Sequence, residues 1–177
     1  MSPSLLIAAV LAVAAPSLPN APVPALDLNR YVGQWHEIAH LPMFFQRKCV
    51  DRTTATYTLQ NNGRIRVHNA CRAKDGSMMS VVGEARRVAG GSPAALQVRF
   101  APDWLGWLPM AWADYWVVEI DPDYRWAVVG GPSRKYLWIL SREPTLDRAL
   151  FEQIKAHAAQ RGYPVEKLVL TAAIGGG

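Results

Sequence analysis

Short stretches of alternating apolar and polar residues run along most of this chain from residue 31 onward. Alternation with a period of two is typical of strands with one buried face, and turn residues such as those at 61–63 and 130–132 separate the stretches. The pattern predicts eight strands, over residues 31–40, 52–60, 64–71, 78–88, 94–100, 112–120, 125–130 and 136–141. Eight antiparallel strands are enough to close an up-and-down β-barrel around side chains or one small ligand.

A helical pattern follows the last predicted strand. Thr145 is a suitable N-cap and Gly162 a suitable terminator, which predicts a helix over about residues 146–161. Its apolar stripe would consist of Leu146, Ala149, Leu150 and Ile154. Residues 165–171 then predict a short closing strand, and residues 173–177 a flexible tail. The expected fold class is all-β: an eight-stranded antiparallel up-and-down barrel within residues 26–172, with one C-terminal α-helix packed outside.

The polarity of the first strand predicts which of its side chains enter the barrel. If Trp35 points inward, alternation carries Glu37 and Ala39 inward with it and leaves His36 and His40 outside. An inward carboxylate beside a tryptophan favours a paired structural acid over a general base.

The same rule selects the residues that face the upper barrel. Strands 112–120 and 125–130 are apolar on both faces, and there we favour the set with Tyr115, Val117 and Trp126 inside. The residues expected to line a ligand site are Tyr57, Val67, Val81, Val98, Tyr115, Val117, Trp126 and Trp138.

The first 25 residues differ from the rest in composition. Residues 5–15 are apolar, a run shorter than the roughly 20 residues that span a bilayer, and a Pro-rich linker follows. We expect a signal peptide and linker over residues 1–25, cleaved after Ala14 or after Ala25, although residues 1–4 lack the usual basic residue. No cysteine lies near this run, so we expect a periplasmic or peripheral outer-membrane protein without a lipid-modified N-terminal cysteine.

The sequence shows no motif typical of a catalytic or metal-binding site. The four histidines lack the spacing of a metal site, and neither a G-x-S-x-G turn nor a Cys/His arrangement occurs. The net charge of +5 does not come with basic and aromatic residues interleaved along a strand face, so no nucleic-acid partner is predicted. We therefore expect a binding protein, with no catalytic residue, metal or cofactor.

Three short motifs resemble, in order and approximate spacing, the signature regions of the lipocalins. They are Gly33-x-Trp35 in the first strand, Asp121-x-Asp123-Tyr124 between the sixth and seventh, and Arg142 after the eighth. Segments 54–57, 113–117 and 136–142 look specifically like the bacterial lipocalin and apolipoprotein D branch, and the resemblance covers about residues 26–172. It implies that Arg142 lies across Trp35 at the closed end of the barrel, where a cation–π contact gives both a structural role.

The resemblance also implies that the barrel binds, transports or stores a small hydrophobic ligand, a fatty acid or lysophospholipid, at the cell envelope. The apolar and aromatic lining suits a lipid tail, with tyrosine hydroxyls as polar handles. Three alternatives remain open. Side chains could fill the barrel completely, the cavity could take the flat ring of a haem or pigment, or the fold could carry an enzyme activity.

Alternate connections of an up-and-down barrel emerge at one end, so loops 40–49, 72–77, 101–111 and 131–135 are expected to surround its mouth. Two of these loops are unusually apolar, and they hold Phe44, Phe45, Trp104 and Trp107 beside basic residues. Such a patch suits peripheral contact with an anionic membrane. A lid over the cavity and a homodimer contact are the alternatives.

The two cysteines are expected at this same mouth. The turn at 61–63 places Cys71 opposite roughly residue 53, so a loop that doubles back is needed to bring Cys49 to it. Export favours a disulfide between them, and two free thiols are the alternative.

Overall fold

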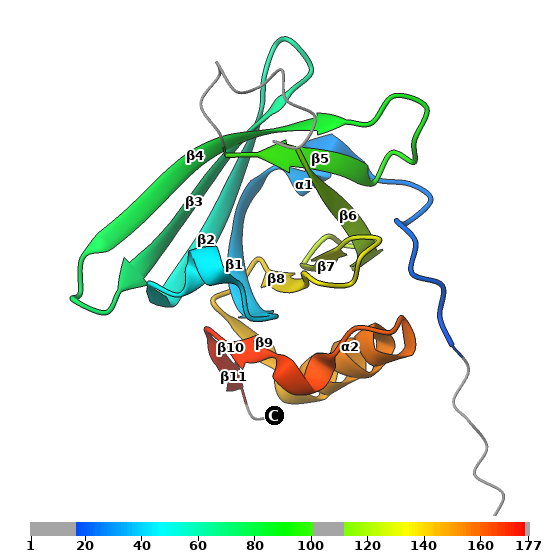
Figure 1. Ribbon diagram of the computed structural model, residues 1–177. Helices are drawn as coiled ribbons and strands as arrows, with labels where there is room; N and C mark the ends of the chain where they lie inside the picture. The colour runs from blue at the N-terminus through cyan, green and yellow to red at the C-terminus, as the bar shows by residue number, and fades with distance from the viewer. Residues whose placement is uncertain (1–16, 101–111, 176–177) are drawn as a thin grey trace, which may run out of the picture.

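The computed structural model describes residues 17–100 and 112–175. Eight antiparallel strands form a closed barrel, because β1 pairs with β8 as well as with β2 (Figure 1). The barrel strands are β1 (Gly33–His40), β2 (Cys49–Leu59), β3 (Ile65–Ala73), β4 (Met78–Arg87), β5 (Ala95–Arg99), β6 (Ala113–Ile120), β7 (Trp126–Gly130) and β8 (Trp138–Ser141). Each pairs with its neighbours in sequence, so the predicted up-and-down barrel is confirmed.

A short helix before the first strand was not predicted. Asp27 caps α1 (Leu28–Tyr31) by accepting a hydrogen bond from the Asn29 amide, and the first strand therefore begins at Gly33 instead of residue 31. Leu28 and Tyr31 are buried against Trp35 in the interior of the barrel. The helix thus covers one end of the barrel.

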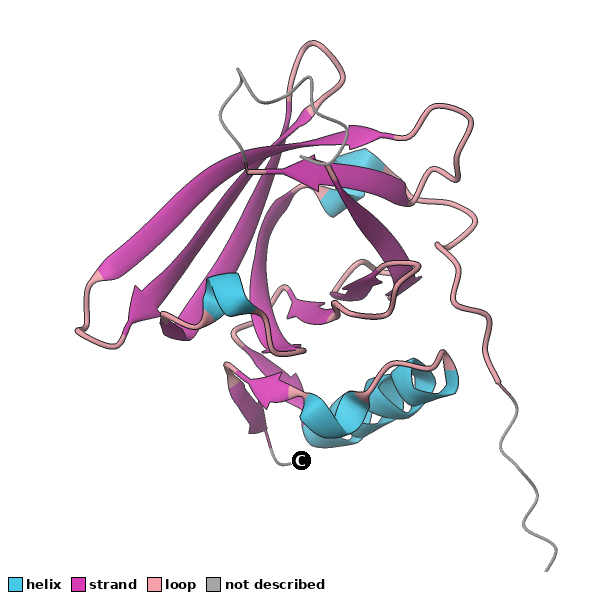
Figure 2. Ribbon diagram, viewed as in Figure 1, coloured by secondary structure: helices cyan, strands magenta, loops and turns pink. Residues whose placement is uncertain are grey.

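The long helix α2 (Arg148–Gln160) lies outside the barrel, as predicted (Figure 2). Its N-cap is Asp147, whose Oδ1 accepts from the Leu150 amide at 2.9 Å, and the expected cap at Thr145 is wrong. Thr145 belongs instead to β9 (Thr145–Asp147). Gly162 ends the helix with a φ of +85°, a conformation that favours glycine. Within residues 17–100 and 112–175, no helix has the length and apolar character that crossing a bilayer requires.

The segment after α2 departs from the prediction in two ways. The expected strand over 165–171 is divided into the 3-10 helix η4 (Val165–Lys167) and β10 (Val169–Leu170), which pairs with the end of β1. Residues 173–175, expected in a flexible tail, form β11 (Ala173–Gly175), which pairs in parallel with β9. The apolar side chain of Ile174 explains this order, since it packs against the core beneath α2.

The apolar residues form two cores separated by the wall of the barrel. One fills the closed half of the barrel around Trp35, and the other lies between the barrel wall and α2. Trp126 and Ala39 were expected inside the barrel, but both pack in the outer core. For Ala39 the reason is an irregularity in β1 between Glu37 and Ala39, which reverses the alternation of the strand's last residues. For Trp126 both faces of β7 are apolar, and Ala127 and Val129 take the inner positions.

The segment before α1 is attached along the outside of the barrel. The Leu18 amide donates to the Gln160 carbonyl at 3.1 Å, and the Val23 amide donates to the Val117 carbonyl at 2.8 Å. The Asn20 side chain accepts from the Tyr163 hydroxyl and donates to the Gly131 carbonyl. Residues 17–25, expected to be a linker, therefore contact α2, β6 and the loop after β7.

Candidate functional site: a cavity inside the barrel

The open half of the barrel encloses a cavity of about 560 Å³. Of the eight residues predicted to line a ligand site, six line this cavity: Tyr57, Val67, Val81, Val98, Tyr115 and Trp138. The cavity is mostly apolar, with small residues such as Ala55 and Ala113 among its lining. The volume lies in the range of sites that enclose small molecules, so side chains do not fill the barrel completely.

The other two predicted lining residues lie elsewhere. Val117 points into the barrel as expected, but it is fully buried in the core beneath the cavity. Trp126 lies on the outer side, against the core under α2. The cavity therefore ends above Val117.

Three tyrosine hydroxyls meet at the floor of this cavity. The Tyr115 hydroxyl oxygen lies 2.6 Å from that of Tyr31 and 2.8 Å from that of Tyr57. Burial raises the pKa of Tyr57 to about 12, and it raises the pKa values of Tyr31 and Tyr115 well above their ordinary value. All three hydroxyls therefore stay protonated at physiological pH.

A buried carboxylate forms part of the cavity wall. Glu37 Oε1 lies 2.7 Å from His40 Nδ1, and Glu37 Oε2 accepts from Gln46 Nε2 at 2.7 Å. Thr171 Oγ1 donates to Glu37 Oε1 at 3.1 Å. Glu37 thus has the structural partners that its position predicted.

The placement of His40 outside the barrel is wrong. The irregularity in β1 brings His40 opposite Trp138, and its side chain is buried beside Glu37. Gln46, on η1 (Phe44–Gln46), was also missed as a site residue, although it accepts from Trp138 Nε1 at 3.4 Å. A hydrogen-bonding partner on a loop leaves no periodic signal in the sequence.

The predicted contact between Arg142 and Trp35 closes the other end of the barrel. The guanidinium carbon lies 3.7 Å from the centroid of the Trp35 ring. The same guanidinium donates to five backbone carbonyl oxygens at 2.7–3.3 Å, those of Arg30, Tyr31, Val32, Gln34 and Tyr124. Gly33 has a φ of +101°, and a Cβ there would lie 3.3 Å from Arg142 Nη1, which explains the glycine at this position.

The motif at 121–124 supports the same end. The Tyr124 hydroxyl accepts from the Asp27 amide at 2.9 Å, and the Arg30 guanidinium lies 4.3 Å from the centroid of the Tyr124 ring. Asp121 accepts two side-chain hydrogen bonds from Arg125, which holds the pKa of its carboxyl below the ordinary value. Asp123 lies 4.0 Å from Arg125 at the surface of this turn.

A disulfide joins Cys49 and Cys71 at the mouth, with their Cα atoms 5.6 Å apart. The pairing of β2 with β3 shifts register on both sides of Asp51, and Arg52 has a φ of +51°. These two shifts bring Cys49 back toward Cys71 across the distance that regular pairing would leave.

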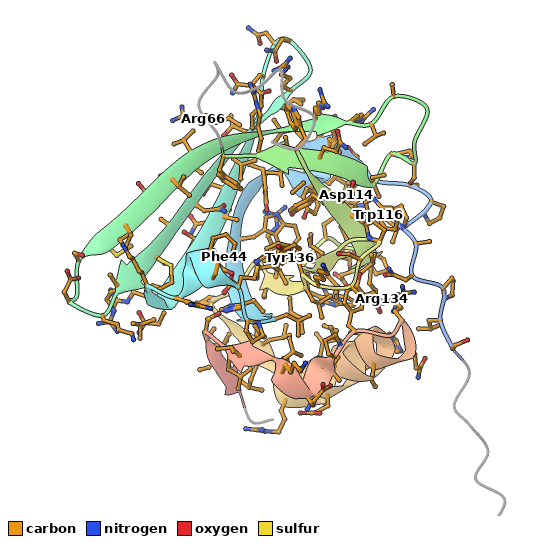
Figure 3. The ribbon with its side chains drawn as sticks, in the orientation of Figure 1. Phe44, Arg66, Asp114, Trp116, Arg134 and Tyr136 are labelled. Atoms are coloured by element: carbon orange, nitrogen blue, oxygen red, sulfur yellow. A yellow bond between two sulfur atoms is a disulfide. The ribbon has the colours of Figure 1, made fainter. Side chains whose placement is uncertain are left out.

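The predicted mouth loops are described in part. Figure 3 shows Phe44 and Tyr136 beside the open centre of the barrel, and Arg66 on its outer side. Phe44 is 72% exposed. Trp104 and Trp107 lie outside the described residues, as does the side chain of Phe45. Among the described residues, no group of three or more histidine, cysteine or acidic side chains is placed to hold a metal ion.

The sequence matches the model of the lipocalin-like domain family over residues 26–173. It is 41% identical to temperature-induced lipocalin-1 of Arabidopsis thaliana over 148 residues, which cover 82% of this chain and 78% of that protein. It is 38% identical to the outer membrane lipoprotein Blc of Citrobacter freundii over 169 residues, 92% of this chain and 91% of that one. It is 32% identical to apolipoprotein D of Mus musculus over 162 residues, 86% of this chain and 80% of that one.

Solved structures agree on the fold. Insecticyanin from the tobacco hornworm Manduca sexta superposes with a TM-score of 0.64 at 19% identity, over 92% of this chain and 93% of that one. At this level of identity the likeness concerns the barrel and its helix only.

Proposed function

Because this chain belongs to the lipocalin family, whose members bind small hydrophobic ligands, we propose that it binds a fatty acid or lysophospholipid in the barrel cavity. The observation that carries the proposal is the cavity of about 560 Å³, lined by apolar and aromatic side chains and closed at one end. Each CH₂ group moved from water into such a lining gains about 0.8 kcal/mol. An unbranched acyl chain can place many CH₂ groups against an apolar lining of this kind.

The charges at the mouth support a lipid with a polar head. Lys48 is among the residues around the cavity, and Arg47 and Lys74 lie on the loops at the same end. A carboxylate or phosphate head would remain near these cations and water, while the tail would occupy the apolar part. A haem or pigment carrier remains the second candidate, which an absorbance spectrum of the purified protein tests directly.

Replacing Trp138 with alanine should weaken binding of lysophosphatidylcholine at least about tenfold, roughly 1.4 kcal/mol, because Trp138 lines the cavity. Competition with a fluorescent fatty acid measures the affinity. Trp126→Ala is the matched control, since that tryptophan packs outside the barrel and should change affinity by less than about twofold. Equal affinities of wild type and Trp138→Ala would place the ligand outside this cavity.

Peripheral contact with an anionic membrane is a second part of the proposal. Basic residues near a negative surface contribute about 1 kcal/mol each, and salt screens this attraction. We expect the protein to co-sediment with phosphatidylglycerol vesicles in low salt, to release as salt rises, and to bind less after Lys48→Glu with Lys74→Glu. Arg66→Glu, on the outer wall, is the control that matches either single substitution in charge. Binding that ignores lipid charge would remove membrane contact from the proposal and leave a lid or a homodimer contact for the apolar mouth loops.

Export to the cell envelope completes the proposal. The relatives called Blc are named as outer membrane lipoproteins, and a disulfide suits an oxidising compartment. The hydrogen bonds of Leu18, Asn20 and Val23 to the barrel favour cleavage after Ala14 over cleavage after Ala25. A cut after Ala25 would remove all three contacts from the mature protein.

A further inference from the structure

The three hydroxyl groups at the cavity floor form a hydrogen-bonded chain in which one hydroxyl proton has no acceptor among the described residues. The Tyr115 hydroxyl is in the middle, 2.6 Å from the Tyr31 oxygen and 2.8 Å from the Tyr57 oxygen. Each hydroxyl can donate one hydrogen bond, so the two contacts use two of the three protons. Within residues 17–100 and 112–175, no other polar group is in hydrogen-bond contact with these three oxygens. One O–H group is therefore left to donate to something else.

The position of the tyrosines indicates where that donor points. Tyr57 and Tyr115 line the cavity, whereas Tyr31 lies beneath them, with its ring centroid 5.3 Å from that of Trp35. An O–H directed from Tyr31 toward Trp35 would meet an aromatic ring in the closed core. A donor on Tyr57 or Tyr115 can turn to the cavity, where a ligand atom can accept from it. Burying a hydroxyl without a partner is costly, so the arrangement favours a ligand that brings an acceptor.

The charge around the floor favours a neutral acceptor. Burial is the main cause of the raised pKa of Tyr57, and the negative charge of Glu37 adds to it. Glu37 also lines the cavity. The same negative charge would oppose a carboxylate or phosphate at the floor, while a hydroxyl or carbonyl oxygen carries no net charge to repel.

We propose that Tyr57 and Tyr115 form a binding subsite for a neutral oxygen at the buried end of the ligand. The inference rests on the proposed function and narrows it to long-chain lipids that carry a hydroxyl or carbonyl group far from the head. The head remains at the mouth, and the chain between the two oxygens lies against the apolar wall.

Palmitic acid and ω-hydroxypalmitic acid test this subsite, because they differ only by a hydroxyl at the tail end. The wild-type protein should bind the hydroxylated acid about tenfold more tightly in isothermal titration calorimetry. Tyr57→Phe combined with Tyr115→Phe should abolish that preference, because neither hydroxyl is then present to donate to the tail-end oxygen. Tyr136→Phe, which removes a hydroxyl at the mouth of the same cavity, should keep the wild-type preference. Thermal melting shows whether the double variant is folded. If it is not, the comparison of the two acids on the wild-type protein still tests the subsite.

The outcomes separate this inference from the proposed function. Equal affinity of the wild-type protein for the two acids overturns the subsite and leaves lipid binding intact. A preference that persists in the folded double variant also overturns it, since the two hydroxyls then have no part in recognition. Failure to bind either acid, or lysophosphatidylcholine, overturns the proposed function itself.

Discussion

Replacing Arg142 with alanine is expected to lower the free energy of unfolding by about 3–5 kcal/mol. The guanidinium lies over Trp35 and donates to backbone carbonyls of α1, β1 and the turn before β7. Its removal takes a donor from several carbonyl oxygens and a cation from the indole, and because these groups are neighbours the losses are coupled. Urea unfolding followed by circular dichroism measures the change.

Two variants show whether this loss comes from geometry or from charge. Arg142→Lys keeps the positive charge but has a single nitrogen, which cannot reach carbonyls from three segments at once, so we expect it to recover less than half of the stability. Arg125→Ala removes an arginine whose side chain is 71% exposed, and we expect a loss of about 1 kcal/mol or less. Ligand affinity of the folded Arg142→Ala protein should match wild type, because Arg142 does not line the cavity. A denaturation midpoint equal to that of the wild type would contradict the structural role of this residue.

Raising the pH above about 10 is expected to destabilise the barrel steeply. The pKa of Tyr57 is about 12 in the folded protein, and those of Tyr31 and Tyr115 are also well above the ordinary value because of burial. The unfolded chain loses its tyrosine protons first, so it binds fewer protons than the folded barrel and stability falls as pH rises. The stabilisation is complete below about pH 10, and for Tyr57 alone about 3 kcal/mol is lost by about pH 12.

Unfolding free energies measured from about pH 8 to about pH 12 test this dependence. Tyr57→Phe removes one titrating group. Between about pH 10 and about pH 12, its free energy of unfolding should therefore fall less steeply than that of the wild type, by about 1.4 kcal/mol per pH unit. Parallel curves for the wild type and Tyr57→Phe would mean that the Tyr57 hydroxyl is not shielded from water.

The alternation of apolar and polar residues predicted most of the fold. It gave the wrong side-chain directions where a strand departs from a period of two. The parity of β2, β3 and β5 placed Tyr57, Val67 and Val98 in the cavity wall, because those strands pair without interruption at these residues. Parity misplaced Ala39 and His40, since the irregularity in β1 changes which face each residue occupies. A sequence shows the composition of a strand, whereas an irregularity depends on the partner strand.

Contacts between residues far apart in the chain were the other feature that the sequence did not predict. Arg142 and Trp35 could be paired only through family resemblance, because an inward arginine does not itself identify its partner. Tyr31 was not expected beside Tyr57 and Tyr115, since it precedes the first strand and belongs to a helix of four residues. The hydrogen-bonded set at the floor thus combines two residues predicted to line the cavity with a third whose helix was not predicted.

The sealed end of the barrel constrains the kinetics of ligand exchange. Arg142, Trp35 and α1 close one side, so a bound molecule must leave by the opening through which it came. A second ligand must enter by the same opening, so it cannot displace the bound one from the closed end. Exchange is therefore dissociative: its rate equals the off-rate of the occupant, whatever the concentration of the competitor. Delivery to an acceptor then requires that something at the mouth raises that off-rate, and not merely that a competing lipid is abundant.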